Sequence, residues 1–166
     1  MKKFGKEGTQ RLKAFHIIFT LMWMGGVGAL IAMQQLGNPS SPDMYLMTTN
    51  DQLMVDRAMI IPGGVGLIAG AALYSACTEI GSPRRRWIQW KWVLTAALVA
   101  IGAGFMGFLV ESNAAYATTA ITEGSFDASV YRWNANAISI AGAVQLAMFL
   151  LCIHLGITKP ERKKRR

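Results

Sequence analysis

The sequence has few charged residues and few side chains suited to metal binding or acid–base chemistry. Charged residues make up 16% of the 166-residue chain, and nine acidic residues face 17 basic ones. A soluble domain usually carries about 25% charged residues. Histidine and cysteine occur only twice each. The shortage of charge argues against a soluble globular domain, and any chemistry has few side chains to use.

Several common catalytic and cofactor motifs are also missing. No C-x-x-C-H motif occurs, which excludes a covalently attached c-type haem. No Walker A loop, G-x-S-x-G or H-E-x-x-H is present. The motifs therefore indicate no particular enzymatic activity, and a redox activity is left open. The two cysteines, Cys77 and Cys152, fall near the ends of apolar segments. We interpret them as packing residues, with a thiol ligand as the alternative.

Long apolar segments dominate what is present. Each is close to the roughly 20 residues that cross the hydrocarbon core as a helix. The four predicted spans are residues 14–33, 58–77, 87–110 and 137–157. The connections at about 34–56 and 111–134 are predicted as loops on one side of the membrane. The sequence therefore predicts an all-α membrane protein, one domain over 1–166, folded as a four-transmembrane-helix up-down-up-down bundle.

Basic residues set the predicted orientation. Fifteen of the 17 lie in three groups, at positions 2–13, 84–91 and 159–166, and the other two are Arg57 and Arg132. The positive-inside rule places the three groups in the cytoplasm. We expect a bacterial-type cytoplasmic (inner) membrane protein with both termini cytoplasmic. Because topology and anionic lipid account for these charges, no nucleic-acid partner is expected.

Three ionisable side chains within the spans fall at one depth. His16, Lys91 and His154 lie within a layer about 5 Å thick, at 1.5 Å per residue. Two imidazoles on neighbouring helices would bind the iron of a b-type haem from both sides. Lys91 would neutralise a haem propionate, and Trp23 continues the helical face of His16. The predicted metal ligands are therefore His16 and His154, with Lys91 and Trp23 as further cofactor-binding residues.

Other interpretations of the same residues stay open. Either histidine alone is typical of an ordinary residue at the membrane interface. A copper-handling protein is a second alternative, since thioethers suit Cu(I) and four methionines cluster around the first predicted loop: Met44, Met47, Met54 and Met59. A non-catalytic accessory subunit is a third. Besides the lipid bilayer and haem, the expected partners are a second copy of the chain or a membrane redox partner.

Short motifs give the chain a family resemblance. They are His16 with Trp23 and Gly25-Gly26, then Pro62-Gly63, Trp90-Lys91 and finally Lys159-Pro160. This pattern resembles four-helix predicted membrane proteins related to the copper-resistance CopD family and, more distantly, HemJ-type protoporphyrinogen oxidases. The resemblance implies a b-type haem close to His16 and a functional Lys91. The chain departs from the HemJ pattern after Trp23, where Met24-Gly25-Gly26 replaces a bulkier stretch.

The predicted orientation is tested by cysteine accessibility. In a Cys77→Ser/Cys152→Ser background, an impermeant thiol reagent added outside intact cells should label Ser125→Cys and leave Gly5→Cys unlabelled, because only Ser125 is expected outside. Lysed cells, in which both positions should react, are the control. The reverse pattern in intact cells would contradict the charge rule for this chain.

Overall fold

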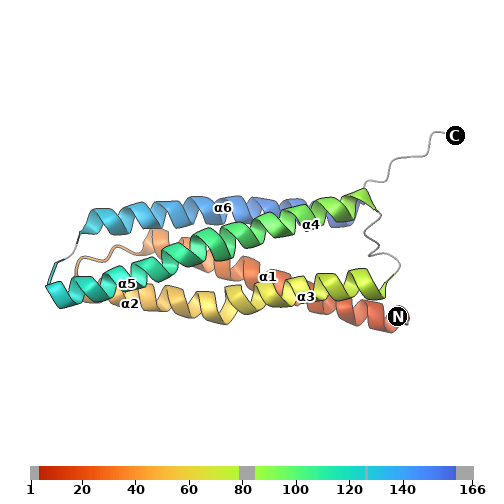
Figure 1. Ribbon diagram of the computed structural model, residues 1–166, viewed down its shortest axis with the longest axis horizontal. Helices are drawn as coiled ribbons and strands as arrows, with labels where there is room; N and C mark the ends of the chain where they lie inside the picture. Colours follow the sequence, from red (N-terminus) through yellow and green to blue (C-terminus); the bar gives the residue numbers. More distant parts are fainter. Residues whose placement is uncertain (1–3, 79–84, 126, 160–166) are drawn as a thin grey trace.

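The computed structural model describes residues 4–78, 85–125 and 127–159, and in these ranges it contains helices and no strands. The helices form four long rods (Figure 1). The elements are α1 (Lys6–Leu36), α2 (Pro42–Val55), η1 (Asp56–Ile60), α3 (Ile61–Cys77), α4 (Arg86–Val99), η2 (Ala100–Met106), α5 (Gly107–Glu123) and α6 (Ala128–Thr158). All four rods are long and apolar enough to cross a membrane, which confirms the predicted all-α bundle.

Both ends of the described chain lie at one end of the bundle, here called the terminal end (Figure 1). The opposite end, which carries the connection at 37–41 and the turn at Gly124, is called the far end. Positions 1–3, 79–84, 126 and 160–166 lie outside the described residues, and they include much of the basic charge on which the predicted orientation depends.

The two predicted far-end loops are mostly helical, which corrects the expectation for 34–56 and 111–134. Ser41 caps α2, since its Oγ accepts a hydrogen bond from the Met44 backbone N at 3.3 Å, and Pro42 suits the first helical turn. Gly124, with φ of 64°, ends α5 in the left-handed conformation. Hydropathy detects only apolar helices. The segments at the far end are polar, so they were predicted as loops although they have residues suited to beginning and ending a helix.

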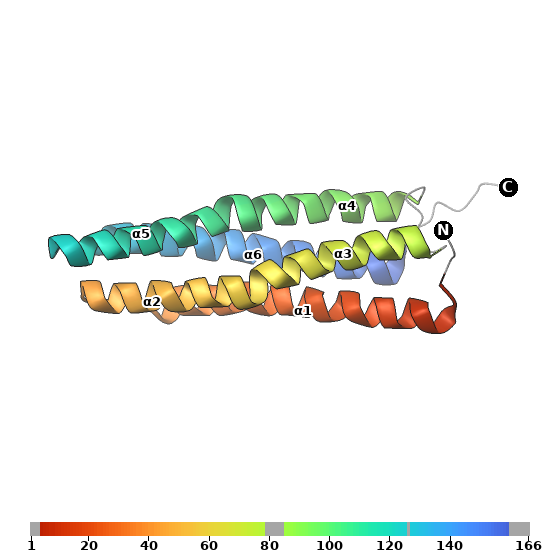
Figure 2. The same ribbon diagram turned by 60° about the horizontal axis from the view of Figure 1, so that its bottom comes forward.

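The two longest rods exceed the thickness of a bilayer. The rod from Pro42 to Cys77 has 36 residues and the rod from Arg86 to Glu123 has 38. At 1.5 Å per residue, a 36-residue helix is about 54 Å long, whereas the hydrocarbon core is about 30 Å thick. In these two rods the apolar predicted spans, 58–77 and 87–110, lie toward the terminal end, so we expect the far end to project from the membrane. Both rods change direction at their π-helical segments, η1 and η2 (Figure 2).

The interior of the far end is polar, in keeping with that projection. Tyr45, on α2, donates from its hydroxyl to Asn113 Oδ1 on α5 at 3.1 Å, and Asn134 of α6 donates to the same oxygen. Gln34 Nε2 donates to Gln52 Oε1 at 3.1 Å between α1 and α2. Tyr45, Asn113, Gln34 and Gln52 are buried, and each makes one of these hydrogen bonds, while Gln34 Oε1, Gln52 Nε2 and Asn113 Nδ2 have no partner among the described residues.

Glycines allow α1 and α3 to pack closely. A Cβ added at Gly63 would lie 2.7 Å from the Trp23 backbone N, and one at Gly66 would overlap the Phe19 ring. A Cβ at Gly70 would lie 3.5 Å from His16 Cβ. Gly63 and Gly66 therefore leave no room for a side chain between α1 and α3, in keeping with the rule that small residues let helix backbones approach in lipid.

This contact predicts a large difference between two glycine substitutions. Gly63→Ala should destabilise the protein by about 1–3 kcal/mol, because the methyl group meets the α1 backbone, which cannot rotate away. Gly104→Ala is the control, since its Cβ would have nothing within 4 Å. Thermal unfolding in detergent should show a lower midpoint for Gly63→Ala alone. Equal midpoints would mean that α1 and α3 can separate at little cost.

Candidate functional site

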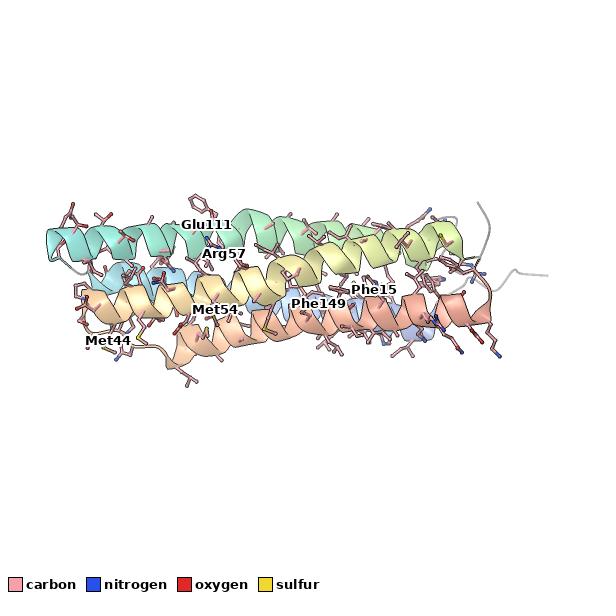
Figure 3. The ribbon with its side chains drawn as sticks, turned by 90° about the horizontal axis from the view of Figure 1, so that it is seen from below. Phe15, Met44, Met54, Arg57, Glu111 and Phe149 are labelled. Carbon is pink, nitrogen blue, oxygen red and sulfur yellow. The ribbon has the colours of Figure 1, made fainter. Side chains whose placement is uncertain are left out.

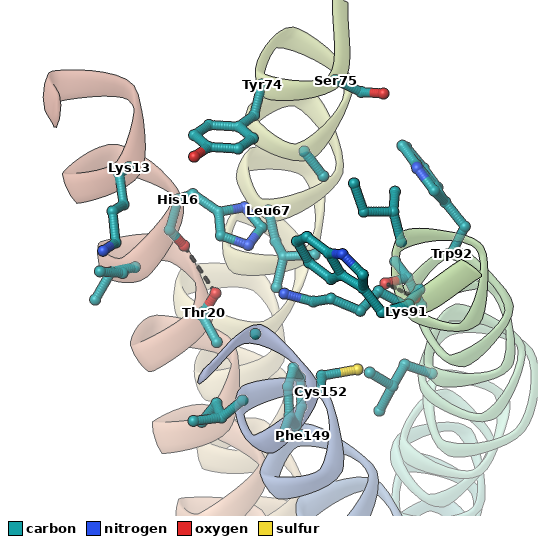
Figure 4. A pocket seen from close by; sticks show the side chains of 18 of the residues that line it. Lys13, His16, Thr20, Leu67, Tyr74, Ser75, Lys91, Trp92, Phe149 and Cys152 are labelled. Atoms are coloured by element: carbon teal, nitrogen blue, oxygen red, sulfur yellow. Dashed lines mark hydrogen bonds between the residues drawn. The ribbon is translucent and has the colours of Figure 1, made fainter. Parts of the chain in front are cut away.

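A cavity of about 490 Å³ lies between α1, α3, α4 and α6 toward the terminal end (Figure 4). This volume is within the 300–1,000 Å³ typical of small-molecule and cofactor pockets. Its walls are largely apolar, and Leu67, Leu98 and Phe149 are among the lining residues. Several ionisable side chains also reach it, and these define the candidate site.

His16 lines the cavity from α1. A Cβ on Gly70 of α3 would lie 3.5 Å from its Nδ1, so the imidazole packs against the bare backbone of α3. Nδ1 is buried and has no hydrogen-bond partner among the residues that the structure describes. Thr20, one turn later on the same wall, donates its hydroxyl to the His16 carbonyl oxygen at 2.7 Å. The imidazole is thus held at the cavity wall, with Nδ1 packed against α3.

Lys91 lines the same cavity from α4 and is half-buried. Its Nζ lies 3.3 Å from where a Cβ on Gly156 would be, so the ammonium reaches across to α6. Lys13 and Lys159 add two further cations to the lining, and no carboxylate of a described residue is among the lining side chains. A charged group held away from water is unfavourable without a partner, so this arrangement favours an anion.

The structure brings together only some of the predicted site residues. His16 and Lys91 share the cavity. His154 is exposed on α6 and does not line the cavity. Trp23 is buried outside the cavity and packs edge-on against the Phe149 ring, with 5.1 Å between the ring centroids. The sequence analysis compared only the depths of His16 and His154, but successive residues also turn by about 100° around a helix. Depth alone therefore does not place a side chain on the inner face.

Cys152 is a cavity residue that the sequence analysis interpreted as packing. It lines the cavity from α6, two positions before His154. A signal for its position was present in the sequence. Gln145 is a polar residue within an apolar span, which favours the inner face of a bundle, and Cys152 lies seven residues, or about two turns, beyond it.

The four methionines of the copper alternative do not gather at one point. Met44, Met47 and Met54 are exposed along α2, and Met59 lies in η1. Met44 and Met54 are ten residues apart, about 15 Å along a helix, and they lie well apart on the ribbon (Figure 3). Within the described ranges no group of three or more His, Cys, Asp or Glu side chains is placed to hold a metal ion.

Comparison of the chain with protein-family models, with curated proteins and with solved structures finds no match. The resemblance to CopD and HemJ-type proteins therefore stays a prediction from short motifs. The four apolar rods establish the broader class, a multi-pass membrane protein in contact with lipid.

Proposed function

We propose that this chain is a haem-binding membrane protein that holds a b-type haem in the cavity, with His16 as an iron ligand and Lys91 beside the propionates. The observation that carries the proposal is the composition of one cavity. Its lining combines an imidazole, three ammonium groups and apolar walls, and none of the described residues that line it has a carboxylate. An amphipathic, doubly acidic cofactor with a metal that imidazole binds well would match all of these features.

His16 fits the role of ligand because its ring lines the cavity, and with Nδ1 packed against the Gly70 backbone the nitrogen left to bind iron would be Nε2. A bound haem would supply reversible one-electron chemistry at its iron. The protein would supply the imidazole, the apolar walls that exclude water, and packing of His16 against Gly70, which limits rotation of the ring.

The lysines fit the acidic edge of the cofactor. Lys91 is half-buried, whereas Lys13 and Lys159 are exposed. Propionates pointing toward the terminal end would therefore meet cations along their length. With the predicted orientation, this end is cytoplasmic, so haem would lie near the inner surface of a cytoplasmic membrane.

Ligation by two histidines stays a prediction, and the cavity favours His16 as the protein ligand that matters most. The exposed side chain of His154 would have to turn inward to reach an iron beside His16. Haem capture, haem sensing and electron transfer to a membrane partner all suit such a site. A second copy of the chain is a further partner that this proposal leaves open.

The ligand is tested by purifying the protein with added haem and recording its absorption spectrum. The wild type should show a Soret band with the stoichiometry of one haem per chain. His16→Ala should lower haem affinity roughly tenfold or more, about 1.4 kcal/mol, because an iron ligand is removed. His154→Ala is the matched control and should keep the spectrum. A colourless wild type would reject the proposal, and loss of the spectrum in both variants would establish two-histidine ligation.

Lys91 is tested separately because its predicted role is electrostatic. Lys91→Met should weaken haem binding about tenfold and leave the shape of the spectrum unchanged, since the ligand is still present. Lys91→Arg should retain most of the affinity because it keeps the positive charge. Titration of detergent-solubilised protein with haem measures both. Equal affinities for all three proteins would show that Lys91 reaches the headgroups instead of the cofactor.

A further inference from the structure

Two walls of the cavity carry apolar side chains that are also exposed on the outside of the bundle. Ile17 and Leu21 of α1 line the cavity and are 45% and 61% exposed. Ile153 and Ile157 of α6 line it as well and are 40% and 77% exposed. All four fall in predicted membrane spans, so their exposed surfaces face lipid. We call the part of the cavity between these four side chains the side window.

The side window lies where α1 and α6 separate. Near the middle of the bundle the two helices pack closely, since a Cβ added at Gly142 would lie 2.8 Å from Ile31 Cγ1. The edge-on contact between the Trp23 and Phe149 rings is nearer the terminal end. Beyond that contact α1 and α6 diverge (Figure 1), and their residues line the cavity. The cavity therefore extends to the lipid-facing surface between these helices.

Each edge of the side window ends in a lysine at the terminal end. On α1, Lys13, Ile17 and Leu21 are spaced four residues apart, which places them on one helical face. On the other edge, Lys159 follows directly after α6 and is two residues beyond Ile157. Both lysines are exposed and line the cavity. The edges thus change from aliphatic to cationic toward the membrane surface, which complements an acidic amphiphile in one leaflet.

We propose that the side window is a lateral entrance through which the cavity takes an acidic amphiphile directly from the lipid. The apolar part would pass between the aliphatic edges while the acid group stays beside Lys13 and Lys159, so that no charge crosses hydrocarbon unpaired. Haem, with its propionates at one edge, would suit this path. The entrance does not depend on haem, however, because it requires only an apolar body with an acid group at one end.

The entrance is tested without haem by using Cys152, which lines the cavity, as a reporter. Haem-free Cys77→Ser protein in lipid nanodiscs is mixed with a fatty acid that carries a maleimide at the end of its chain, and mass spectrometry follows the labelling. Leu21→Trp should slow labelling about tenfold, equivalent to about 1.4 kcal/mol on the barrier to entry, because the larger side chain narrows the side window. Ile18→Trp is the matched control and should not change the rate, since Ile18 is also 61% exposed on α1 but does not line the cavity.

The lysines are tested with the same reporter. Lys13→Gln/Lys159→Gln should slow labelling by the fatty-acid maleimide, because the acid group loses its partners at the membrane surface. The rate with an uncharged N-alkylmaleimide of equal length should not change. An equal effect on both reagents would contradict selection of an acidic amphiphile.

Two results would overturn the entrance itself. One is a wild-type Cys152 that the fatty-acid maleimide does not label, which would mean that the cavity is closed to lipid. The other is an equal labelling rate in Leu21→Trp and Ile18→Trp. If Leu21→Trp fails to fold, Ile157→Trp replaces it, with the exposed, non-lining Leu150→Trp as its control. A protein that is labelled as expected but binds no haem would contradict only the proposed function.

Discussion

The close approach of α1 and α3 is the constraint on which the candidate site depends. In lipid, apolar side chains gain little by leaving their surroundings, so helices associate through tight packing of small residues. Gly63, Gly66 and Gly70 provide that packing over two turns of α3. The same contact holds His16 at a fixed height on the cavity wall. A larger residue at Gly70 would meet the imidazole directly, so the packing glycines and the candidate ligand form one unit.

The fold was largely predictable because the membrane imposes a simple rule. A segment that crosses hydrocarbon must satisfy its own backbone hydrogen bonds, so a long apolar run indicates a helix. The far-end helices were missed because that rule is silent where the chain is polar. There, capping residues such as Ser41 and Gly124 determine the ends, and they indicate a helix only when they are considered together with the segment between them.

The site was only partly predictable, for a geometric reason. Sequence position gives the expected depth of a residue in the membrane, and His16 and Lys91 do line one cavity. Rotation about the helix axis decides whether a side chain faces inward, and helices that are apolar on all sides carry little polar patterning to fix it. His154 and Cys152 are two residues apart at nearly equal depth, yet Cys152 lines the cavity and His154 does not. Polar residues such as Gln145 provide the missing information about rotation.

The buried core of the bundle also determines from which end molecules can enter the cavity. Leu98 and Phe149 line it, and the buried core continues through Val27, Met106 and Ile138 toward the far end. Leu98, which lines the cavity, and Met106 are eight residues apart, about 12 Å along the α4–η2 rod. A ligand in the cavity is therefore separated from the far end by this buried apolar core. Polar molecules and protons would reach it from the terminal end, where Lys13 and Lys159 line the cavity. A haem held there would accordingly exchange ligands with that side of the membrane, and any partner that receives haem from it would bind at the terminal end.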